Sequence, residues 1–405
     1  MIHLAKRDRI NPAASWGIRL AAFVLGLLVC GVLAFIMIEK LQKDPGRIGE
    51  FYQSFLKGVY SDNAASFLAN RKFWVFLKNI AVLLCIALAV TPAFRMRFWN
   101  IGAEGQTLVG VLAATAVSVY IGGTGKGAVS LLPEWALLIL MFIAAIIASS
   151  IWGLIPALFK ARWNTNETLF TLMMNYVATY LVSFFLIEWV PSGSSALGEL
   201  PYGYLPNIPI YADNPNAPSN KYILIIVLVF LLAGILYIYL KRSKHGYELT
   251  VVGESERTAR YVGISVKKVT IRTMVLSGAL CGFAGYLIAA GLDHSVTTES
   301  VGGQGFTAIM VSWLANFNPL AMILTAAVIV FLNQGASQIS TTFGVSGAFP
   351  SVVVGVMLFF IIGSEFFIHY KLCFSRSGAA AQEHKMPEAA EKTETSETEG
   401  KENAQ

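Results

Sequence analysis

No charged side chain and no histidine interrupts the chain between Ser300 and Ser364. A helix needs roughly 20 residues to cross the hydrocarbon of a bilayer, so this stretch is long enough for about three passes. Helix-breaking residues divide it at 316–319, which contains Pro319, and at 341–350, which contains Gly344 and Pro350. The pattern predicts a membrane domain rather than a soluble core.

Uncharged windows of spanning length recur along the rest of the chain, at residues 20–38, 135–159, 168–187, 222–240 and 273–292. Two shorter candidates lie at 79–94 and 107–121, where Pro92 and Gly122 are expected to end the helices. We therefore predict an all-α, polytopic membrane protein with about ten transmembrane helices, some of them short or broken.

Composition agrees with this class. The 405 residues are 55% hydrophobic and 13% charged, against about 25% charged in soluble domains. We expect a cytoplasmic N-terminus at 1–19, whose following apolar run is a retained signal anchor, and a transmembrane permease domain at 20–370. Residues 371–405 are expected to form a disordered acidic cytoplasmic tail, because from Gly378 onward seven Glu and three Lys accompany few apolar residues.

Basic residues predict the orientation, since Lys and Arg stay on the cytoplasmic side of short loops. Arg95 and Arg97, then Lys160 and Arg162, and then the dense cluster at 241–272 fall on one side when the N-terminus is inside. An even number of helices puts both termini in the cytoplasm of a bacterial cell membrane. Residues 39–106 and 302–318 leave the local topology open, because the former carries many basic residues and the latter could cross fully or re-enter.

Enzymatic and metal chemistry find no support. Three of the four cysteines lie in apolar windows, and the five histidines are scattered without ligand spacing, so we predict no catalytic residue, no metal and no cofactor. Residues 122–127 resemble a phosphate loop but lack its first glycine and the Ser or Thr after Lys126. The basic balance reflects membrane orientation, and we expect no nucleic-acid binding.

The segment from Trp99 to Gln106 places Asn100, Glu104 and two glycines between apolar helices. Polar groups at membrane depth are costly unless they face protein or a water-filled path, so the segment is a candidate pathway element. The alternative is a helix start, where Glu104 would lie in a first turn near exposed N–H groups. The residues alone leave both interpretations open.

Asn164 and Glu167 have capping-box spacing before the next apolar helix, with Asn164 expected at the N-cap. Asn175, two turns into that helix, could contact solute or bond an adjacent helix. On the helix at 273–292, Gly278, Gly282 and Gly285 form a face of small residues that predicts close helix packing.

The cytoplasmic segment at 241–272 is longer than a simple connection. Within it, residues 254–263 are predicted to form one short helix, with acids at its start, Arg260 four residues after Glu256, and Gly263 as its end. Such a helix suits docking of a soluble partner, although a solvated helix held only by lipid headgroups has the same pattern.

Several of these segments together resemble the permease subunits of bacterial ABC importers for branched-chain amino acids, simple sugars and nucleosides. They are residues 98–106, the helix after Glu167, and the glycine-rich series at 253–263, 277–285 and 305–306. The segment Asn-Ile-Gly-Ala-Glu-Gly-Gln at 100–106 is the most specific, and looks most like the larger permease of nucleoside importers. The similarity covers about residues 20–369 in order.

The resemblance implies a half-channel that pairs with a second permease in a heterodimer, receives solute from an extracytoplasmic binding lipoprotein or protein, and works with an ATP-binding subunit. It implies that ATPase coupling involves Glu254, Glu256, Ala259, Arg260 and Gly263. The family commonly has Ala-Ala before the final glycine, whereas this chain has Thr258 and Ala259. ATP hydrolysis is expected in the partner, and membrane lipid is expected around the permease.

The solute is predicted to be small, neutral and polar, with a nucleoside favoured and a simple sugar as the alternative. Amides and indoles could supply hydrogen bonds and stacking surfaces for either solute, and the candidate pathway residues are Trp99, Asn100, Glu104, Gln106, Asn175, Gln304 and Trp313. An ion-coupled secondary transporter is the rival class. The uncharged stretch at 300–364 argues against it, because its polar groups are amides such as Asn333, Gln334 and Gln338, and hydroxyls.

Overall fold

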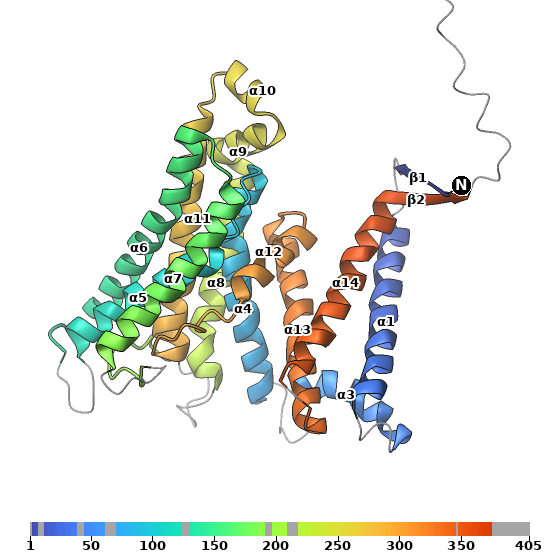
Figure 1. The fold of residues 1–405 in the computed structure, drawn as a ribbon. Coiled ribbons are helices and arrows are strands. Elements are labelled where there is room, and N and C mark those ends of the chain that lie inside the picture. The colour runs from blue at the N-terminus through green and yellow to red at the C-terminus, as the bar shows by residue number, and fades with distance from the viewer. Residues whose placement is uncertain are drawn as a thin grey trace, which may run out of the picture. The chain divides into compact units, whose positions relative to one another are not determined.

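The structure is a computed structural model that describes residues 2–6, 12–38, 44–60, 70–123, 130–190, 197–208, 218–345 and 347–374. The predicted acidic tail therefore lies, apart from residues 371–374, outside the described residues. Within the described part of the chain, nine helices are long and apolar enough to cross a membrane. This confirms the prediction of an all-α polytopic membrane protein (Figure 1).

The helices follow the predicted windows closely, and their bounds are α1 (Pro12–Met37), α3 (Ile48–Val59), α4 (Arg71–Arg95), α5 (Ala103–Val117), α6 (Glu134–Trp163), α7 (Glu167–Trp189), α8 (Pro218–Arg242), α9 (Lys244–Glu254), α10 (Glu256–Tyr261), α11 (Val266–Ile288), α12 (Gln304–Leu314), α13 (Pro319–Phe343) and α14 (Phe349–His369). Short helical turns are η1 (Pro45–Arg47), η3 (Ser118–Gly122) and η4 (Ala289–Asp293), and the strands are β1 (Ile2–Lys6) and β2 (Tyr370–Phe374).

The chain divides into two compact units, and each is described by itself. The smaller unit comprises Met1–Glu39 and Gly355–Gln405. In it α1 packs against the later part of α14, where an added methyl group at Gly26 would lie 2.9 Å from the sulfur of Met357. Arg19 and Glu365 form an ion pair at 2.7 Å, and β1 pairs antiparallel with β2.

The larger unit, Lys40–Val354, is built around α4, α5 and α11, which are buried over about two thirds of their spanning windows. The glycine face of α11 allows this packing. An added methyl group at Gly278 would lie 2.5 Å from the carbonyl oxygen of Ser149 on α6, and one at Gly285 would lie 2.6 Å from that of Thr107 on α5. The prediction that these glycines serve close helix packing is confirmed.

The predicted breaks near the C-terminal end of this unit are also confirmed. Asn316 and Phe317 have positive φ, Asn318 caps α13 with its side chain, and Pro319 occupies the first turn. Gly344 ends α13 in the left-handed conformation, with φ of 68°. Because α12 has only eleven residues, it is about 17 Å long and too short to span a bilayer alone.

Two expectations were wrong in detail. Pro92 does not end α4, which continues to Arg95 with the proline in its last turn. The region at 39–78 also contains an unpredicted amphipathic helix, α3, which packs along α13. There Phe55 approaches Gly335 so closely that a methyl group on that glycine would lie 2.9 Å from the Cα of Phe55.

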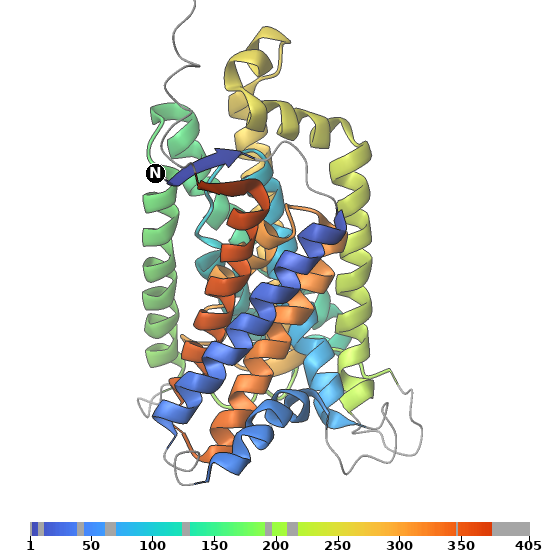
Figure 2. The ribbon, with the colours of Figure 1, turned by 90° about the vertical axis from the view of Figure 1, so that its right-hand side faces the viewer.

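At one end of the larger unit, α9 lies across the bundle between α8 and α10 (Figure 2). The C-terminal end of α6 and the first turns of α11 lie at the same end, below α10 (Figure 1).

Candidate functional site

The connection from α4 to α5 is held by a pair of buried amides. Asn100 and Gln106 are 0% and 1% exposed, and each side-chain NH₂ group donates to the carbonyl oxygen of the other at 3.3 Å. Asn100 also donates to the hydroxyl of Ser277 on α11 at 3.2 Å and accepts from the backbone N–H of Gly102 at 3.0 Å. The amide groups of both residues are therefore used inside the protein.

Helix α7 holds the same connection from the other side. The side chain of Asn175 accepts from the N–H of Gly105 at 2.9 Å and donates to the carbonyl of Ile101 at 3.0 Å, and Thr171 accepts from the N–H of Ile101 at 3.2 Å. A methyl group on Gly105 would lie 2.9 Å from the Cα of Asn175, so glycine is needed for this approach. Of the two interpretations of Asn175, the structure displays the helix-to-helix bond.

Glu104 joins α5 to the start of α12. Its two carboxylate oxygens accept from the N–H of Gly303 at 2.7 Å and from that of Gly305 at 2.6 Å. The carboxylate thus binds the positive end of a helix that is distant in sequence, in addition to lying in the first turn of its own helix. Together with the amide pair and Asn175, this forms what we name the junction network: Asn100, Glu104, Gln106 and Asn175.

The predicted cap of α7 is right in kind and wrong in residue. Asn166, not Asn164, is the N-cap, and its side chain accepts from the N–H groups of Thr168 and Leu169 at 3.0 and 3.2 Å. Asn164 instead ends α6 in the left-handed conformation, and Glu167 is the first residue of α7 and pairs with Lys160 at 2.8 Å. Helix α7 therefore begins two residues later than the capping-box spacing predicted.

The two predicted indoles lie together. The rings of Trp99 and Trp313 are 5.5 Å apart, and the side chains are 42% and 52% exposed. Phe94 meets Trp99 at 5.6 Å and stacks with Phe317 at 6.1 Å. The result is an accessible aromatic surface beside the junction network.

Gln304, the remaining predicted pathway residue, lines a cavity of about 290 Å³ between α4, α12 and α13. We name it the amide cavity. Its lining consists of uncharged polar and apolar groups, namely Asn79, Leu83, Gly302, Gln304, Thr307, Val330, Asn333, Gln334 and Ser337. Asn79 was not predicted, because it lies at the start of an apolar window and no spacing marks it.

A second cavity of about 410 Å³ shares Gln334 and Ser337 with the first and extends along α13 to Gln338 and Thr341. The carbonyl oxygen of the Gln334 side chain is buried, and no hydrogen-bond donor reaches it among the described residues. An unsatisfied buried acceptor is costly, so this side chain has a hydrogen-bonding capacity that the described residues do not use.

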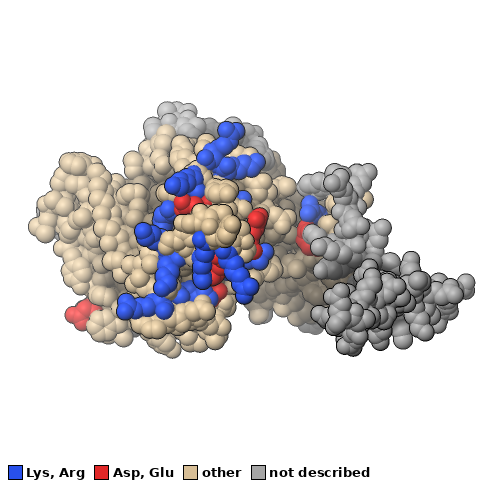
Figure 3. Space-filling view, turned by 90° about the horizontal axis from the view of Figure 1, so that it is seen from above, with Lys and Arg blue, Asp and Glu red and all other residues tan. Residues whose placement is uncertain are grey.

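The segment at 241–272 contains the two helices α9 and α10 where one was predicted. Glu254 is the last residue of α9, and α10 starts at Glu256 after Ser255, whose hydroxyl caps it. The predicted pair of Glu256 and Arg260 is present at 3.2 Å, and Gly263 ends the turn with φ of 82°. Lys and Arg side chains gather on this face of the molecule (Figure 3).

The α9–α10 segment presents exposed groups on a fixed base. Within α10 the side chain of Ala259 is fully buried, whereas the side chains of Tyr261 and Val262, at the end of the helix, are 93% and 55% exposed. Sequence reasoning missed these two side chains, since their exposure depends on how the turn is placed. An apolar, exposed tip on a charged loop is typical of a protein contact.

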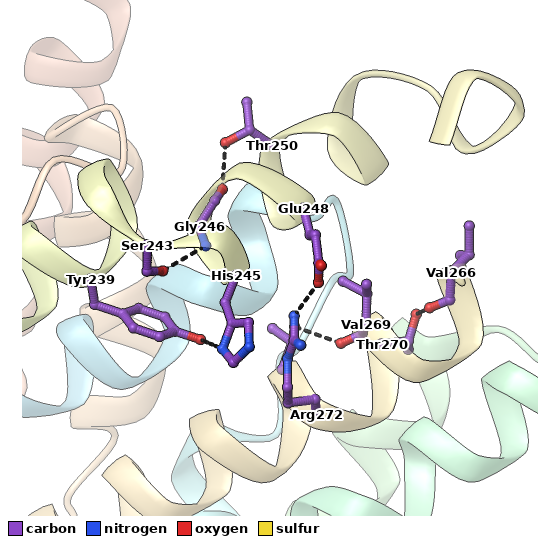
Figure 4. A network of polar contacts seen from close by, with 11 residues as sticks. Tyr239, Ser243, His245, Gly246, Glu248, Thr250, Val266, Val269, Thr270 and Arg272 are labelled. Carbon is purple, nitrogen blue, oxygen red and sulfur yellow. Dashed lines mark hydrogen bonds and ion pairs between the residues drawn. The ribbon is translucent and has the colours of Figure 1, made fainter. Parts of the chain in front are cut away.

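The base is fixed by contacts from α9 to three spanning helices. Glu248 pairs with Arg272 of α11 at 2.7 Å, and Tyr239 of α8 lies 3.5 Å from the Nδ1 of His245 (Figure 4). Gly253 packs directly on the carbonyl of Arg95 at the end of α4. Helix α9 therefore connects α10 directly to α4 and α11.

Among the described residues, no group of His, Cys, Asp and Glu side chains could hold a metal ion. The chemistry that the site offers is hydrogen bonding, aromatic stacking and protein docking.

Comparisons with known proteins agree with these features. Residues 73–362 match the family described as the permease component of branched-chain amino acid transport systems. Over 312 residues the chain is 31% identical to the glucose ABC transporter permease TsgB13 of Haloferax volcanii, covering 73% of this chain and 78% of that one. It is 29% identical to the guanosine ABC transporter permease NupP of Bacillus subtilis, covering 71% and 80%. It is 24% identical to the nucleoside ABC transporter permease NupB of Lactococcus lactis, covering 75% and 82%.

Proposed function

The chain belongs to the permease family of branched-chain amino acid transport systems, and we propose that it moves a small neutral polar solute, a nucleoside, as one permease of an ATP-driven importer. Its relatives are ABC transporter permeases, which are transport components rather than enzymes. A simple sugar is the second candidate, because a glucose permease is among the relatives.

The amide cavity is the observation that carries this proposal. Its side chains offer donors and acceptors without a charge, and the buried side-chain oxygen of Gln334 has no hydrogen-bond donor among the described residues. A neutral polar molecule can exchange its water for such groups at low cost, whereas an ion would lose its hydration without a counter-charge. The exposed rings of Trp99 and Trp313 would add a stacking surface for a base or a sugar.

The exposed polar face of α13 supports a second permease. Asn333, Ser337 and Thr341 follow one another at helical spacing, and all three are exposed on a helix of spanning length. Each of the three side chains donates a hydrogen bond to a carbonyl of its own helix, but a continuous polar face is still unfavourable against lipid, so a facing subunit or a water-filled path between the two permeases is the better cover for it. We propose that the pathway runs along this face, between α13 and the second permease.

The junction network is proposed to position this pathway rather than to bind solute. Through Glu104 it holds the first turn of α12, and Gln304 lies between the two glycines that Glu104 binds. The amide pair of Asn100 and Gln106 then fixes the start of α5 against α11. A shift of α4 or α11 would be transmitted through this network to Gln304.

Coupling to ATP is proposed to take place at α9 and α10. The ATP-binding subunit would contact Glu256, Arg260 and the apolar tip at Tyr261, while Glu254, the last residue of α9, and Gly263 flank α10. Closure of the ATP-binding subunits would push α10, and the ion pair of Glu248 with Arg272 would pass the movement to α11. On this account the face with α10 is cytoplasmic, which its concentration of Lys and Arg supports (Figure 3).

With α10 inside, both termini face the cytoplasm and the opposite end of the bundle would receive solute from an extracytoplasmic binding protein. The segment at 39–78, with α3, would then lie outside. This topology is tested by labelling single cysteines at Glu299 and at Arg257 with a membrane-impermeant thiol reagent in intact cells, in a background without the native cysteines. Labelling of the former alone is expected, and labelling of the latter alone would reverse the orientation.

Transport itself is tested with the chain assembled with its ATP-binding subunit and second permease in proteoliposomes. We expect uptake of guanosine that requires ATP and that purine nucleosides inhibit more strongly than glucose. Stronger inhibition by glucose would favour the sugar permease. Uptake that follows an ion gradient in the absence of ATP would contradict the proposal.

A further inference from the structure

A basic cavity of about 570 Å³ lies under α10, at the end of the bundle where α6 ends and α11 begins. Four cationic side chains from three helices line it, namely Lys160, Arg162, Arg260 and Lys267. One carboxylate, that of Glu256, is in its lining, and Glu167 pairs with Lys160 from outside it. The lining alone carries a net charge of +3, which favours an anion.

Uncharged donors accompany these cations. Ser265 and the first two residues of α11 line the cavity, and the side chain of Ser265 makes no capping bond to the helix. The N–H groups of a first helical turn favour negative charge. Asn164, at the end of α6, adds its amide from the opposite wall. The cavity therefore combines point charges and donors that suit phosphate oxygens.

A shallow, open apolar groove of about 350 Å³ lies along one face of α7. It begins at Asn166, two residues after Asn164. Its lining is Asn166 at one end and then Leu169, Phe170, Met173, Met174 and Val177. From Leu169 to Val177 the helix rises about 12 Å, close to the depth of one leaflet of hydrocarbon, about 15 Å. A soluble anion would have no use for this surface, but an acyl chain would.

Aromatic side chains connect the two sites. Phe170 of the groove meets Phe159 of α6 at 4.9 Å, and Phe159 meets Trp163 at 5.0 Å. The guanidinium of Arg162, which lines the cavity, lies 5.6 Å from the Trp163 ring. Trp163 is 61% exposed at the end of a spanning helix, which is the usual place for an interfacial tryptophan.

From these observations we propose that the cavity binds the phosphate headgroup of an anionic phospholipid, with one acyl chain lying along the groove on α7. The headgroup would touch α6, α10 and α11 at once, and so would brace α10 against the bundle. The proposal requires only that the chain lies in a membrane. It does not depend on the solute, and it shares Glu256 and Arg260 with the surface proposed to contact the ATP-binding subunit.

The test measures lipid binding by native mass spectrometry. The full chain is purified in detergent, dioleoyl phosphatidylglycerol is added, and the fraction of chain that carries the lipid is measured after the detergent is removed in the instrument. The double variant Arg162→Glu with Lys267→Glu is compared with a control of equal charge change, Arg242→Glu with Lys268→Glu, whose residues lie outside the cavity lining. We expect the first pair to weaken binding about tenfold and the control to leave it within about twofold of the parent chain. Equal binding by both double variants would overturn the proposal.

Further arms separate a lipid from other occupants. Dioleoyl phosphatidylcholine is expected to bind at least about tenfold more weakly than phosphatidylglycerol, and inorganic phosphate at millimolar concentration is expected not to displace the lipid. Equal binding of the two lipids, or displacement by phosphate, would contradict the site as described. Size-exclusion chromatography checks that each variant is folded. If the glutamate pair does not fold, Arg162→Gln with Lys267→Gln replaces it, and unchanged binding of that variant would also refute the site.

Discussion

The junction network and the amide cavity are built from the same kinds of residue and use them in opposite ways. In the junction network, Asn100, Gln106 and Asn175 make their hydrogen bonds to other parts of the protein. In the amide cavity, Gln304 and Gln334 line open space, and the side-chain oxygen of Gln334 has no donor among the described residues. Glu104 lies at the border of the two regions.

The difference shows that a polar residue within a membrane domain has two distinct uses. Where its partners are internal, it fixes an irregular backbone that lipid would not tolerate. Where it faces a cavity, it is available to a solute, and its loss should change binding more than folding. A substitution in the junction network should therefore reduce the stability of the fold, whereas the same substitution in the amide cavity should reduce the affinity for solute.

The largest effect is expected for Glu104→Ala. The change leaves the N–H groups of Gly303 and Gly305 without their charged acceptor, at a cost of about 3 kcal/mol in the free energy of unfolding. Thermal unfolding in detergent should shift strongly to lower temperature. The matched control, Glu299→Ala, removes an exposed carboxylate from the preceding loop and should leave the transition in place. Similar shifts of the unfolding temperature for both variants would show that Glu104 does not stabilise the protein by capping α12.

Asn175→Ala should cost about 2 kcal/mol, because the N–H of Gly105 and the carbonyl of Ile101 lose a buried partner. The same substitution at Asn333, which is exposed beside the amide cavity, should change the free energy of unfolding by less than about 0.5 kcal/mol. Denaturant titration in detergent measures both. A larger loss of unfolding free energy for Asn333→Ala would show that this side of the amide cavity stabilises the fold.

A smaller effect, on the affinity for solute rather than on stability, is expected for Asn79→Leu. It replaces a polar wall of the amide cavity with an apolar one of similar size, so half-saturation of guanosine uptake should rise about tenfold, equivalent to about 1.4 kcal/mol. The unfolding temperature should stay close to that of the parent. Leu83→Ile, an apolar change in the same wall, is the control. Unchanged half-saturation would place the solute elsewhere.

The sequence was a sufficient guide to the spanning helices, because hydrophobic length and helix breakers are local properties. The break at 316–319 and the end of α13 at Gly344 followed from the residues themselves. It could not reveal the role of Glu104, whose partners are 199 and 201 positions away. Nor could it separate Asn175 from Asn333, since the difference lies in which surface each amide faces.

The errors were mostly of register. The cap of α7 was placed two residues early, and α10 was extended to Glu254 because the break at Ser255 has no Gly or Pro to mark it. The helix α3 was missed because its charges obscured an apolar face that only α13 explains.

Solute protection of a cysteine in the amide cavity tests the central claim most directly. Ser337→Cys would be introduced into the chain without its native cysteines, assembled with its partners in proteoliposomes, and labelled with a small polar thiol reagent. The account predicts that saturating guanosine slows labelling at position 337 about tenfold, as expected for a site about 90% occupied, while a cysteine at Glu299 reacts at the same rate with and without solute. Equal labelling rates at position 337 in the presence and absence of a transported solute would contradict the pathway along α13.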